Sequence, residues 1–277
     1  MRKAPDALAP EAALPRSAGP VYYPRRVRES ERAELEAYRD LFAAAPAGVP
    51  AQTRTVGSAV ALRVPGAPLV ELNRIVGLTA SAQLDELESF YGEDRIVVSL
   101  DPGAGLDDEL RRRGYSEGYP WQKFERGLEP YEARSDLWVA DAERAGEFGR
   151  IIAVAFGAPP DLAGWLDRLV ARPGWHVFIS YYGERPVGGG ALFVTGKTGW
   201  FGIAGTLPEA RGRGSQGAIF AARIERAREL GLELLVTETG VPRDGKPGPS
   251  YRNMLRVGLE PIYVRPNYVR GGATRSP

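Results

Sequence analysis

The residues best suited to chemistry form a corner rich in arginine and glycine, Arg211-Gly212-Arg213-Gly214-Ser215-Gln216-Gly217. An apolar strand precedes this corner, and a helical pattern that ends at Gly231 follows it. The first backbone N–H groups of a helix have no partner within the helix, and they lie at the positive end of its dipole. Because glycine lets a ligand approach these amides and arginine adds positive charge, the corner is typical of a site for phosphate.

Other interpretations of this corner differ in how well they fit. A P-loop needs a lysine followed by Ser or Thr after its last glycine, but Ala218 and Ile219 follow Gly217. A dinucleotide site remains open, because Glu238 lies near the end of the next strand, where such folds carry an acidic residue. A solvated turn at the start of a helix is also compatible with the spacing.

The helix after the corner has an amphipathic pattern. Its apolar face is formed by Gly217, Phe220, Ile224 and Ala227. The same pattern predicts that three charged residues point away from the core: Arg223, Arg226 and Glu229.

The strand, the corner and the helix resemble the GCN5-related N-acetyltransferases. In that family a strand is followed by Arg or Gln, two residues, Gly, one residue, and Gly or Ala; Arg211, Gly214 and Gln216 occupy these positions here. Gln216 departs from the usual small residue, although Gly217 follows it. The resemblance extends from Asp136 to Tyr268. It implies an acyl-CoA-dependent N-acyltransferase that moves an acetyl group from acetyl-CoA to an amine of a small molecule, without a metal.

The resemblance also implies which residues bind the cofactor. The backbone from Ile203 to Leu207 would hold the pantetheine arm, with the thioester near Ala204 and Gly205, and the corner would hold the pyrophosphate. The expected cofactor-binding residues are Ile203, Gly205, Thr206, Leu207, Arg211, Gly212, Arg213, Gly214, Ser215, Gln216, Gly217, Ser250 and Asn253.

Two residues are candidates for catalysis, which in this family depends on positioning and proton transfer. Glu238 is the expected base, although a carboxylate exposed at a strand end would look the same in the sequence. Many relatives use a tyrosine just before the closing Gly-Phe of the last helix as general acid. Met254 stands at that position here, so Tyr251, one turn earlier, is the expected substitute. His176, the single histidine, is expected to be a structural strand residue.

Composition narrows the function classes. The 277 residues are 43% hydrophobic, and 36 Lys plus Arg face 35 Asp plus Glu, a formal net charge of +1 that does not favour binding to nucleic acid or a membrane. The chain has no cysteine, which excludes disulfides, thiolate metal sites and a cysteine nucleophile. No apolar run is long enough for a membrane span, and we expect a soluble, cytoplasmic protein.

The predicted elements form a series that occurs twice, as a duplication would produce. Before the linker at 129–134 we expect helices over 29–45, 81–91 and 105–113 and strands over 53–64, 69–78, 95–100 and 121–126. After it we expect helices over 143–156, 162–171, the stretch after the corner and 250–257, and strands over 135–140, 175–182, 185–195, 198–207, 233–239 and 261–269.

This series predicts an α+β fold of two GCN5-related domains, each a central, mostly antiparallel mixed sheet flanked by helices. The expected ranges are a disordered leader (1–20), a degenerate domain (21–130), an acyltransferase domain (131–270) and a tail (271–277). In the first half the stretch Gly77-Leu78-Thr79-Ala80-Ser81-Ala82 stands where the second has its corner, with one glycine and no arginine. We therefore expect one CoA per chain.

Two further hypotheses remain. A non-catalytic CoA-binding or scaffold module would agree with Met254 at the tyrosine position. An acyltransferase with a carrier-protein pantetheine donor would need no site for the 3′-phosphate of CoA.

Overall fold

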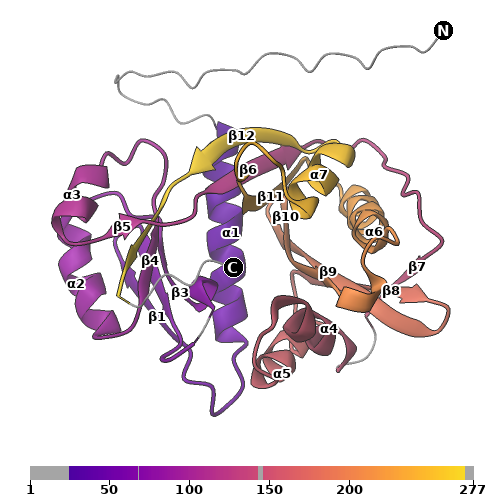
Figure 1. The fold of residues 1–277 in the computed structure, drawn as a ribbon, viewed down its shortest axis with the longest axis horizontal. Helices are drawn as coiled ribbons and strands as arrows, with labels where there is room; N and C mark the ends of the chain where they lie inside the picture. Colours follow the sequence, from indigo (N-terminus) through magenta and orange to yellow (C-terminus); the bar gives the residue numbers. More distant parts are fainter. Residues whose placement is uncertain (1–24, 68, 143–145, 272–277) are drawn as a thin grey trace, which may run out of the picture.

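The computed structural model describes residues 25–67, 69–142 and 146–271, and the predicted leader and most of the predicted tail lie outside these ranges. Two sheets lie side by side, and the long helix α1 runs between them (Figure 1). No helix of the described part has the length and apolar character needed to cross a bilayer.

The elements of the first half are α1 (Arg25–Ala43), β1 (Gln52–Val56), β2 (Ala59–Arg63), a 3₁₀ turn (Val70–Leu72), β3 (Asn73–Val76), α2 (Ala82–Tyr91), β4 (Ile96–Ser99), α3 (Asp107–Arg112), β5 (Ser116–Glu117) and β6 (Trp121–Arg126). The second half contains β7 (Trp138–Asp141), α4 (Glu147–Phe156), α5 (Asp161–Asp167), β8 (Trp175–Tyr182), β9 (Arg185–Thr195), β10 (Thr198–Thr206), a 3₁₀ turn (Pro208–Ala210), α6 (Ser215–Glu229), β11 (Leu234–Gly240), α7 (Pro249–Arg256), β12 (Glu260–Arg265) and β13 (Asn267–Arg270).

The two sheets have the same plan. The first has the order β1-β2-β3-β4-β13-β5, and the second has the order β12-β6-β11-β10-β9-β8-β7. Each contains one parallel pair, β3 with β4 and β10 with β11, and its other pairs are antiparallel. In each half a helix, α2 or α6, connects the strands of the parallel pair. The predicted fold class, two mostly antiparallel mixed sheets flanked by helices, is confirmed.

The halves exchange their last strands. β6 follows β5 in the chain but pairs with β11 and β12 of the second sheet, while β13 follows β12 but pairs with β4 and β5 of the first. The stretch expected as one strand over 261–269 is thus two strands in different sheets, separated by Pro266, which has no N–H to donate. A single boundary near residue 130 therefore does not separate the two sheets.

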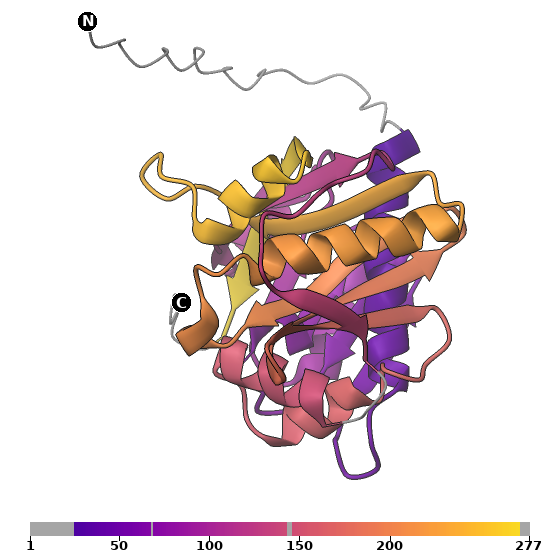
Figure 2. The same ribbon diagram turned by 90° about the vertical axis from the view of Figure 1, so that its right-hand side faces the viewer.

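Helices cover both faces of the second sheet. α1 and α4 pack on one face, where Tyr38, Phe148 and Trp200 join the same core, and α6 lies on the other (Figure 2). Three consecutive glycines of β9, Gly188 to Gly190, allow this close packing. A Cβ on Gly189 would meet Phe148 of α4 at 2.9 Å, and one on Gly190 would meet Ile219 of α6 at 2.6 Å.

Several predicted bounds need correction. The strand expected over 53–64 is the hairpin β1–β2, which turns at Gly57 with a positive φ of 59°. The strand expected over 69–78 begins as a 3₁₀ turn, and the one expected over 135–140 begins only at Trp138. The helix expected over 143–156 begins at Glu147, and residues 143–145 lie outside the described ranges.

One side-chain orientation was predicted wrongly. Arg223 of α6 does not point into solvent but lies against the sheet, with 1% of its surface exposed. The reason is its position three residues after Phe220, on the apolar side of the helix.

Candidate active site

The N-terminus of α6 is open toward a cavity. Its N-cap residue, Gly214, has no side chain that could occupy the first amides, and the first turn contains no acidic residue. Gly212 and Gly214 have positive φ values of 80° and 83°, a conformation that other residues adopt only with strain. The corner therefore needs its glycines for its shape as well as for access to the amides.

The cavity has a volume of about 1410 Å³. Its walls come from the end of β10, the corner, the starts of α6 and α7, the last residues of α4 and the segment before β7. Eleven of the thirteen expected cofactor-binding residues line it: Gly205, Thr206, Arg211, Gly212, Arg213, Gly214, Ser215, Gln216, Gly217, Ser250 and Asn253. The other two, Ile203 and Leu207, turn their side chains into the core shared with α1 and α4.

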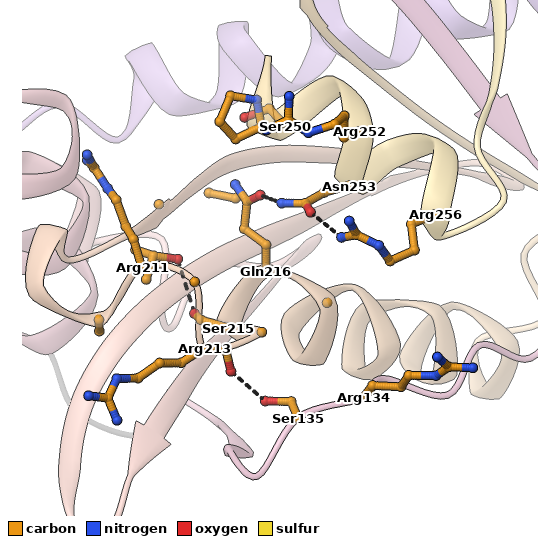
Figure 3. A pocket seen from close by; sticks show the side chains of 18 of the residues that line it. Arg134, Ser135, Arg211, Arg213, Ser215, Gln216, Ser250, Arg252, Asn253 and Arg256 are labelled. Atoms are coloured by element: carbon orange, nitrogen blue, oxygen red, sulfur yellow. Dashed lines mark hydrogen bonds between the residues drawn. The ribbon is translucent and has the colours of Figure 1, made fainter. Parts of the chain in front are cut away.

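Arginines dominate the charge of the cavity. Five of them line it, against two carboxylates, Glu132 and Asp136; the arginines are Arg134, Arg211, Arg213, Arg252 and Arg256. None of the five has an ion pair with a carboxylate of the described residues. In Figure 3, Arg211 and Arg213 lie on one edge and Arg134 and Arg256 on the other. The cavity thus presents an excess of positive charge around the open amides.

The predicted linker and the residue that follows it, Ser135, are part of the cavity wall. The hydroxyl of Ser135 donates to the backbone carbonyl of Arg213 at 3.1 Å and accepts from the amide of Leu137 at 3.1 Å. A Cβ on Gly214 would lie 2.9 Å from the Cβ of Ser135. The segment before β7 therefore packs against the corner and leaves no room for a side chain at Gly214.

The unusual Gln216 connects α6 to α7. Asn253 of α7 donates from its amide nitrogen to the Oε1 atom of Gln216, and its own Oδ1 accepts from Arg256 at 2.6 Å. These contacts are drawn in Figure 3. A small residue at position 216 could not make the first of them, so the departure from the family pattern has a structural role here.

β10 is distorted where a pantetheine arm is expected. Its pairing with β9 shifts between Gly202 and Gly205, and Ile203 has a positive φ of 47°, which is rare for a β-branched residue. β10 pairs with β11 only as far as Trp200; beyond it, the hydroxyl of Thr237 donates to the carbonyl of Phe201 at 2.7 Å. The two parallel strands thus separate at the bulge and leave part of the β10 backbone without β11 as a partner.

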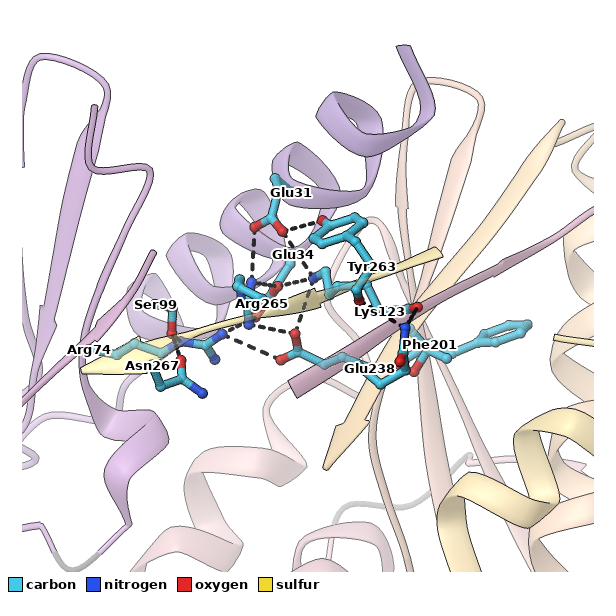
Figure 4. A network of polar contacts seen from close by, with 12 residues as sticks. Glu31, Glu34, Arg74, Ser99, Lys123, Phe201, Glu238, Tyr263, Arg265 and Asn267 are labelled. Carbon is cyan, nitrogen blue, oxygen red and sulfur yellow. Dashed lines mark hydrogen bonds and ion pairs between the residues drawn. The ribbon is translucent and has the colours of Figure 1, made fainter. Parts of the chain in front are cut away.

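Glu238 lies outside the cavity, in a buried group of charges that we call the ion network (Figure 4). It contains three carboxylates, Glu31, Glu34 and Glu238, and three cations, Arg74, Lys123 and Arg265. Only 5% of the Glu238 side chain is exposed, and its oxygens lie 3.1 Å from Lys123 Nζ and 3.4 Å from Arg74 Nη2. The members come from α1, β3, β6, β11 and β12, so the network connects both sheets.

The network sets different pKa values for its carboxyl groups. Burial opposes ionisation of Glu34, but Arg265, Arg74 and Lys123 outweigh it and hold the pKa of Glu34 well below its ordinary value. At Glu238 burial outweighs the cations and raises the pKa of that carboxyl. Because Glu238 points toward the first sheet and away from the cavity, it does not fit the ribose-binding acid of a dinucleotide fold.

The expected proton donor is half-buried. The ring of Tyr251 packs edge-on against Phe124, with 5.0 Å between ring centroids, and burial raises the pKa of its phenol. It does not line the cavity, although its neighbours Ser250 and Arg252 do. Met254 is buried in the core beneath α7.

His176 lies on β8 outside the cavity lining. Its Nδ1 atom is 3.2 Å from Arg226, and burial together with that arginine lowers the pKa of the imidazole. The contacts agree with the structural role expected for this residue.

Among the cavity residues that sequence reasoning missed are Arg134, Phe156, Arg252 and Arg256. Arg252 and Arg256 stand four residues apart on α7, next to the expected Ser250 and Asn253, which was a usable signal. Arg134 lay in a segment interpreted only as a linker, and no local pattern connects it with the corner.

The fold is that of the GCN5-related N-acetyltransferases, in a two-domain arrangement. A GCN5-related N-acetyltransferase from Kribbella flavida aligns with a TM-score of 0.63 and 16% identity, over 90% of this chain and 96% of that one. A tandem protein of this family from the clavulanic acid biosynthesis pathway aligns with a TM-score of 0.55 and 15% identity, over 89% and 97%. A further member, from Sphaerobacter thermophilus, aligns with a TM-score of 0.53 and 15% identity, over 88% and 89%.

Comparison of the sequence alone finds no matching family model and no matching curated protein. At these identities the structural likeness establishes the fold, and the resemblance seen in the sequence is confirmed at that level. The chemistry has to be argued from the site.

Proposed function

We propose that the protein is an acyltransferase that moves a short acyl group from CoA to an amine of a small molecule. The observation that carries this proposal is the open N-terminus of α6 with five arginines around it, none of which forms an ion pair with a carboxylate in the described part of the chain. CoA presents a pyrophosphate and a 3′-phosphate, which together carry roughly three to four negative charges near neutral pH. The charge and the size of the cavity suit such a ligand.

The arrangement of the arginines supports CoA in preference to a simple phosphate. Arg211 and Arg213 flank the first amides of α6 and would bind the pyrophosphate. Arg134 and Arg256, on the other edge of the cavity in Figure 3, would bind the 3′-phosphate. A carrier-protein pantetheine has no 3′-phosphate, so the second pair favours CoA over that donor.

The gap in pairing between β10 and β11 offers a place for the pantetheine arm of the donor. Backbone groups of β10 beyond Phe201, on the side that β11 no longer covers, would hydrogen-bond to the pantetheine amides as a strand would. The thioester would then lie at the bulge near Ala204 and Gly205. A backbone N–H at this point would stabilise the negative charge that develops on the thioester oxygen.

The reaction is a simple exchange of bonds. The amine nitrogen attacks the thioester carbon, a C–N bond forms and the C–S bond breaks. The amine loses a proton to a base, and the departing thiolate takes a proton to become free CoA. In this proposal Glu238 is the base and Tyr251 the acid, because burial makes the first more basic than an ordinary carboxylate and keeps the second protonated.

Glu238 points toward Arg74 of the first sheet and does not line the cavity. The acceptor amine would therefore approach from the junction of the halves, while CoA enters from the corner. This agrees with a role for the first half as a wall of the acceptor site.

The alternative is a CoA-binding module without catalysis, favoured by Met254 at the position where relatives carry a tyrosine. Incubation of the protein with acetyl-CoA and other short acyl-CoA thioesters and a panel of amines, with free thiol measured over time, separates the two. We expect amine-dependent thiol release. Tight CoA binding without release by any amine would favour the module.

A further inference from the structure

Arg223 differs from the other deeply buried cations of the protein. Arg74, Lys123 and Arg265 are each paired with carboxylates of the ion network. Arg223 is 1% exposed and forms no ion pair with any carboxylate of the described residues. It is therefore a buried positive charge without a counter-charge in the part of the chain that the structure describes.

The guanidinium has few other partners. Nη1 donates to the carbonyl of Ala191 at 3.0 Å, while Nε is buried without a hydrogen-bond partner among the described residues. Its carbon lies 4.6 Å from the ring centroids of Phe201 and of Phe220. Burial lowers the pKa of Arg223 to about 9, and no carboxylate offsets this effect.

These contacts stabilise the guanidinium only in part. The faces of two aromatic rings attract a cation, and one carbonyl satisfies one of its five N–H groups. An unpaired buried charge nevertheless remains costly, and proteins normally pair such a charge or use it to bind a ligand. A missing anion is the simplest explanation of an arginine in this place.

Arg223 lies next to the wall of the cavity at the bulge of β10. The point where a Cβ on Gly190 would lie is 3.4 Å from Arg223 Cζ and 3.3 Å from the Cβ of Ala204. Ala204 lines the cavity. Phe201, which contacts the guanidinium, is also the residue at which β10 and β11 separate. The charge therefore lies close to the place proposed for the thioester.

We propose that Arg223 binds a carboxylate at the far end of the acyl group, so that the donor is the CoA thioester of a dicarboxylic acid, such as malonyl-CoA or succinyl-CoA. This inference rests on the proposed function and narrows its acyl group. A carboxylate a few bonds beyond the thioester can form a charge-assisted hydrogen bond with Nε or Nη2. An acetyl group ends in a methyl and leaves the guanidinium unpaired.

Isothermal titration with pairs of thioesters of matched shape tests this proposal. Malonyl-CoA is compared with isovaleryl-CoA, and succinyl-CoA with isohexanoyl-CoA, because each pair differs in a carboxylate against a branched alkyl end. We expect the wild-type protein to bind either malonyl-CoA or succinyl-CoA at least about tenfold more tightly than the neutral thioester with which it is paired.

The variant Arg223→Met, which keeps most of the side-chain volume, should lose this preference and bind free CoA as the wild type does. Its ligand-free form should also melt at a higher temperature than the ligand-free wild type, because an unpaired buried charge has been removed. Arg228→Met, an exposed arginine of the same helix, is the matched control and should keep the preference.

The outcomes separate the two proposals. If free CoA binds but neither carboxylate is preferred by the wild type, the role of Arg223 is wrong and the acyltransferase proposal stands. A preference that survives in a folded Arg223→Met protein also overturns this role. If free CoA does not bind at all, both proposals fail. The wild-type comparison needs no variant, so the test holds even if Arg223→Met does not fold.

Discussion

The two halves place a helix at the same point of a similar sheet plan, yet the turns that lead into these helices differ. In the second half, Gly214 leaves the first amides of α6 free of side chains. In the first half, the side chain of Gln83 folds back over the turn before α2. Its Oε1 atom accepts from the amides of Thr79 and Ala80, each at 3.0 Å. Its Nε2 atom donates to the carbonyl of Val56 at 2.7 Å.

The first turn of α2 also carries an acid, Asp85, where that of α6 has none. The two halves thus share a backbone plan, while their side chains differ in what they leave available. In the first half a side chain accepts from two amides of the turn before the helix; in the second half the first amides of the helix are open to the cavity, and arginines lie around them. A fold does not determine a site, and here the two copies illustrate this within one chain.

Gly214→Asp should have the largest effect on this difference. The substitution places a side chain against Ser135, a negative charge at the anion site and a strained conformation at a φ of 83°. We expect CoA binding to disappear, from a stoichiometry of one per chain to none, in isothermal titration.

The control is Ser81→Asp, which adds the same charge at the N-cap of α2, a position where aspartate is well tolerated. This variant should bind CoA as the wild type does. A folded Gly214→Asp protein with an unchanged dissociation constant would show that the corner is not the cofactor site.

Glu238→Gln should have the second-largest effect. If Glu238 is the base, kcat/KM should fall by about a hundredfold, with little change in CoA affinity. The pKa of Glu238 is raised and the charged form is the active one, so wild-type kcat/KM should decrease as the pH falls through this raised pKa. The variant should lose that dependence.

Glu31→Gln separates the base from the ion network. Glu31 pairs with Arg265 at 2.9 Å but lies on α1, so its loss disturbs the network without removing the Glu238 carboxylate. Equal rate losses in both variants, with an unchanged pH profile, would mean that Glu238 has a structural role. Both variants should unfold at lower temperature, because each leaves a buried cation with one partner fewer.

Arg256→Gln tests the second pair of arginines. If Arg256 meets the 3′-phosphate, CoA should bind about tenfold more weakly, while dephospho-CoA should bind as it does to the wild type. Arg228→Gln, on the outer side of α6, is the control. Equal affinity of the wild type for CoA and dephospho-CoA would contradict this role and reopen the carrier-protein donor.

Local patterns in the sequence were sufficient for most helices and strands and for the corner itself. The corner was predictable because glycine, arginine and a helix start are adjacent in the chain. The exchange of β6 and β13 was not, since it depends on which distant strand offers the better partner, and both strands have ordinary β patterns. The ion network was not predictable for the same reason, because its members are spread through the chain from Glu31 to Arg265.

Two charged residues that their sequence positions could leave exposed are buried in the structure. The prediction from the helical pattern directs Arg223 away from the core, although its spacing from Phe220 puts it on the packed face. For Glu238 the alternative of a carboxylate exposed at a strand end is wrong, because its side chain meets three cations that no local pattern places beside it. Its role as the base stays a prediction. Whether a charged side chain is buried depends on partners that come from elsewhere in the chain.

Gln83→Ala should have the smallest effect, and it tests the comparison from the other side. The variant removes the side-chain amide that occupies the turn before α2, and it leaves the backbone amides of Thr79 and Ala80 without their acceptor. The free energy of unfolding, measured with urea, should fall by about 1 kcal/mol. An anion could then reach the turn, but Asp85 remains nearby and no arginine is added, so titration should still give one CoA per chain. A second CoA bound by this variant would mean that a single side chain, and not the missing arginines, had closed the first site.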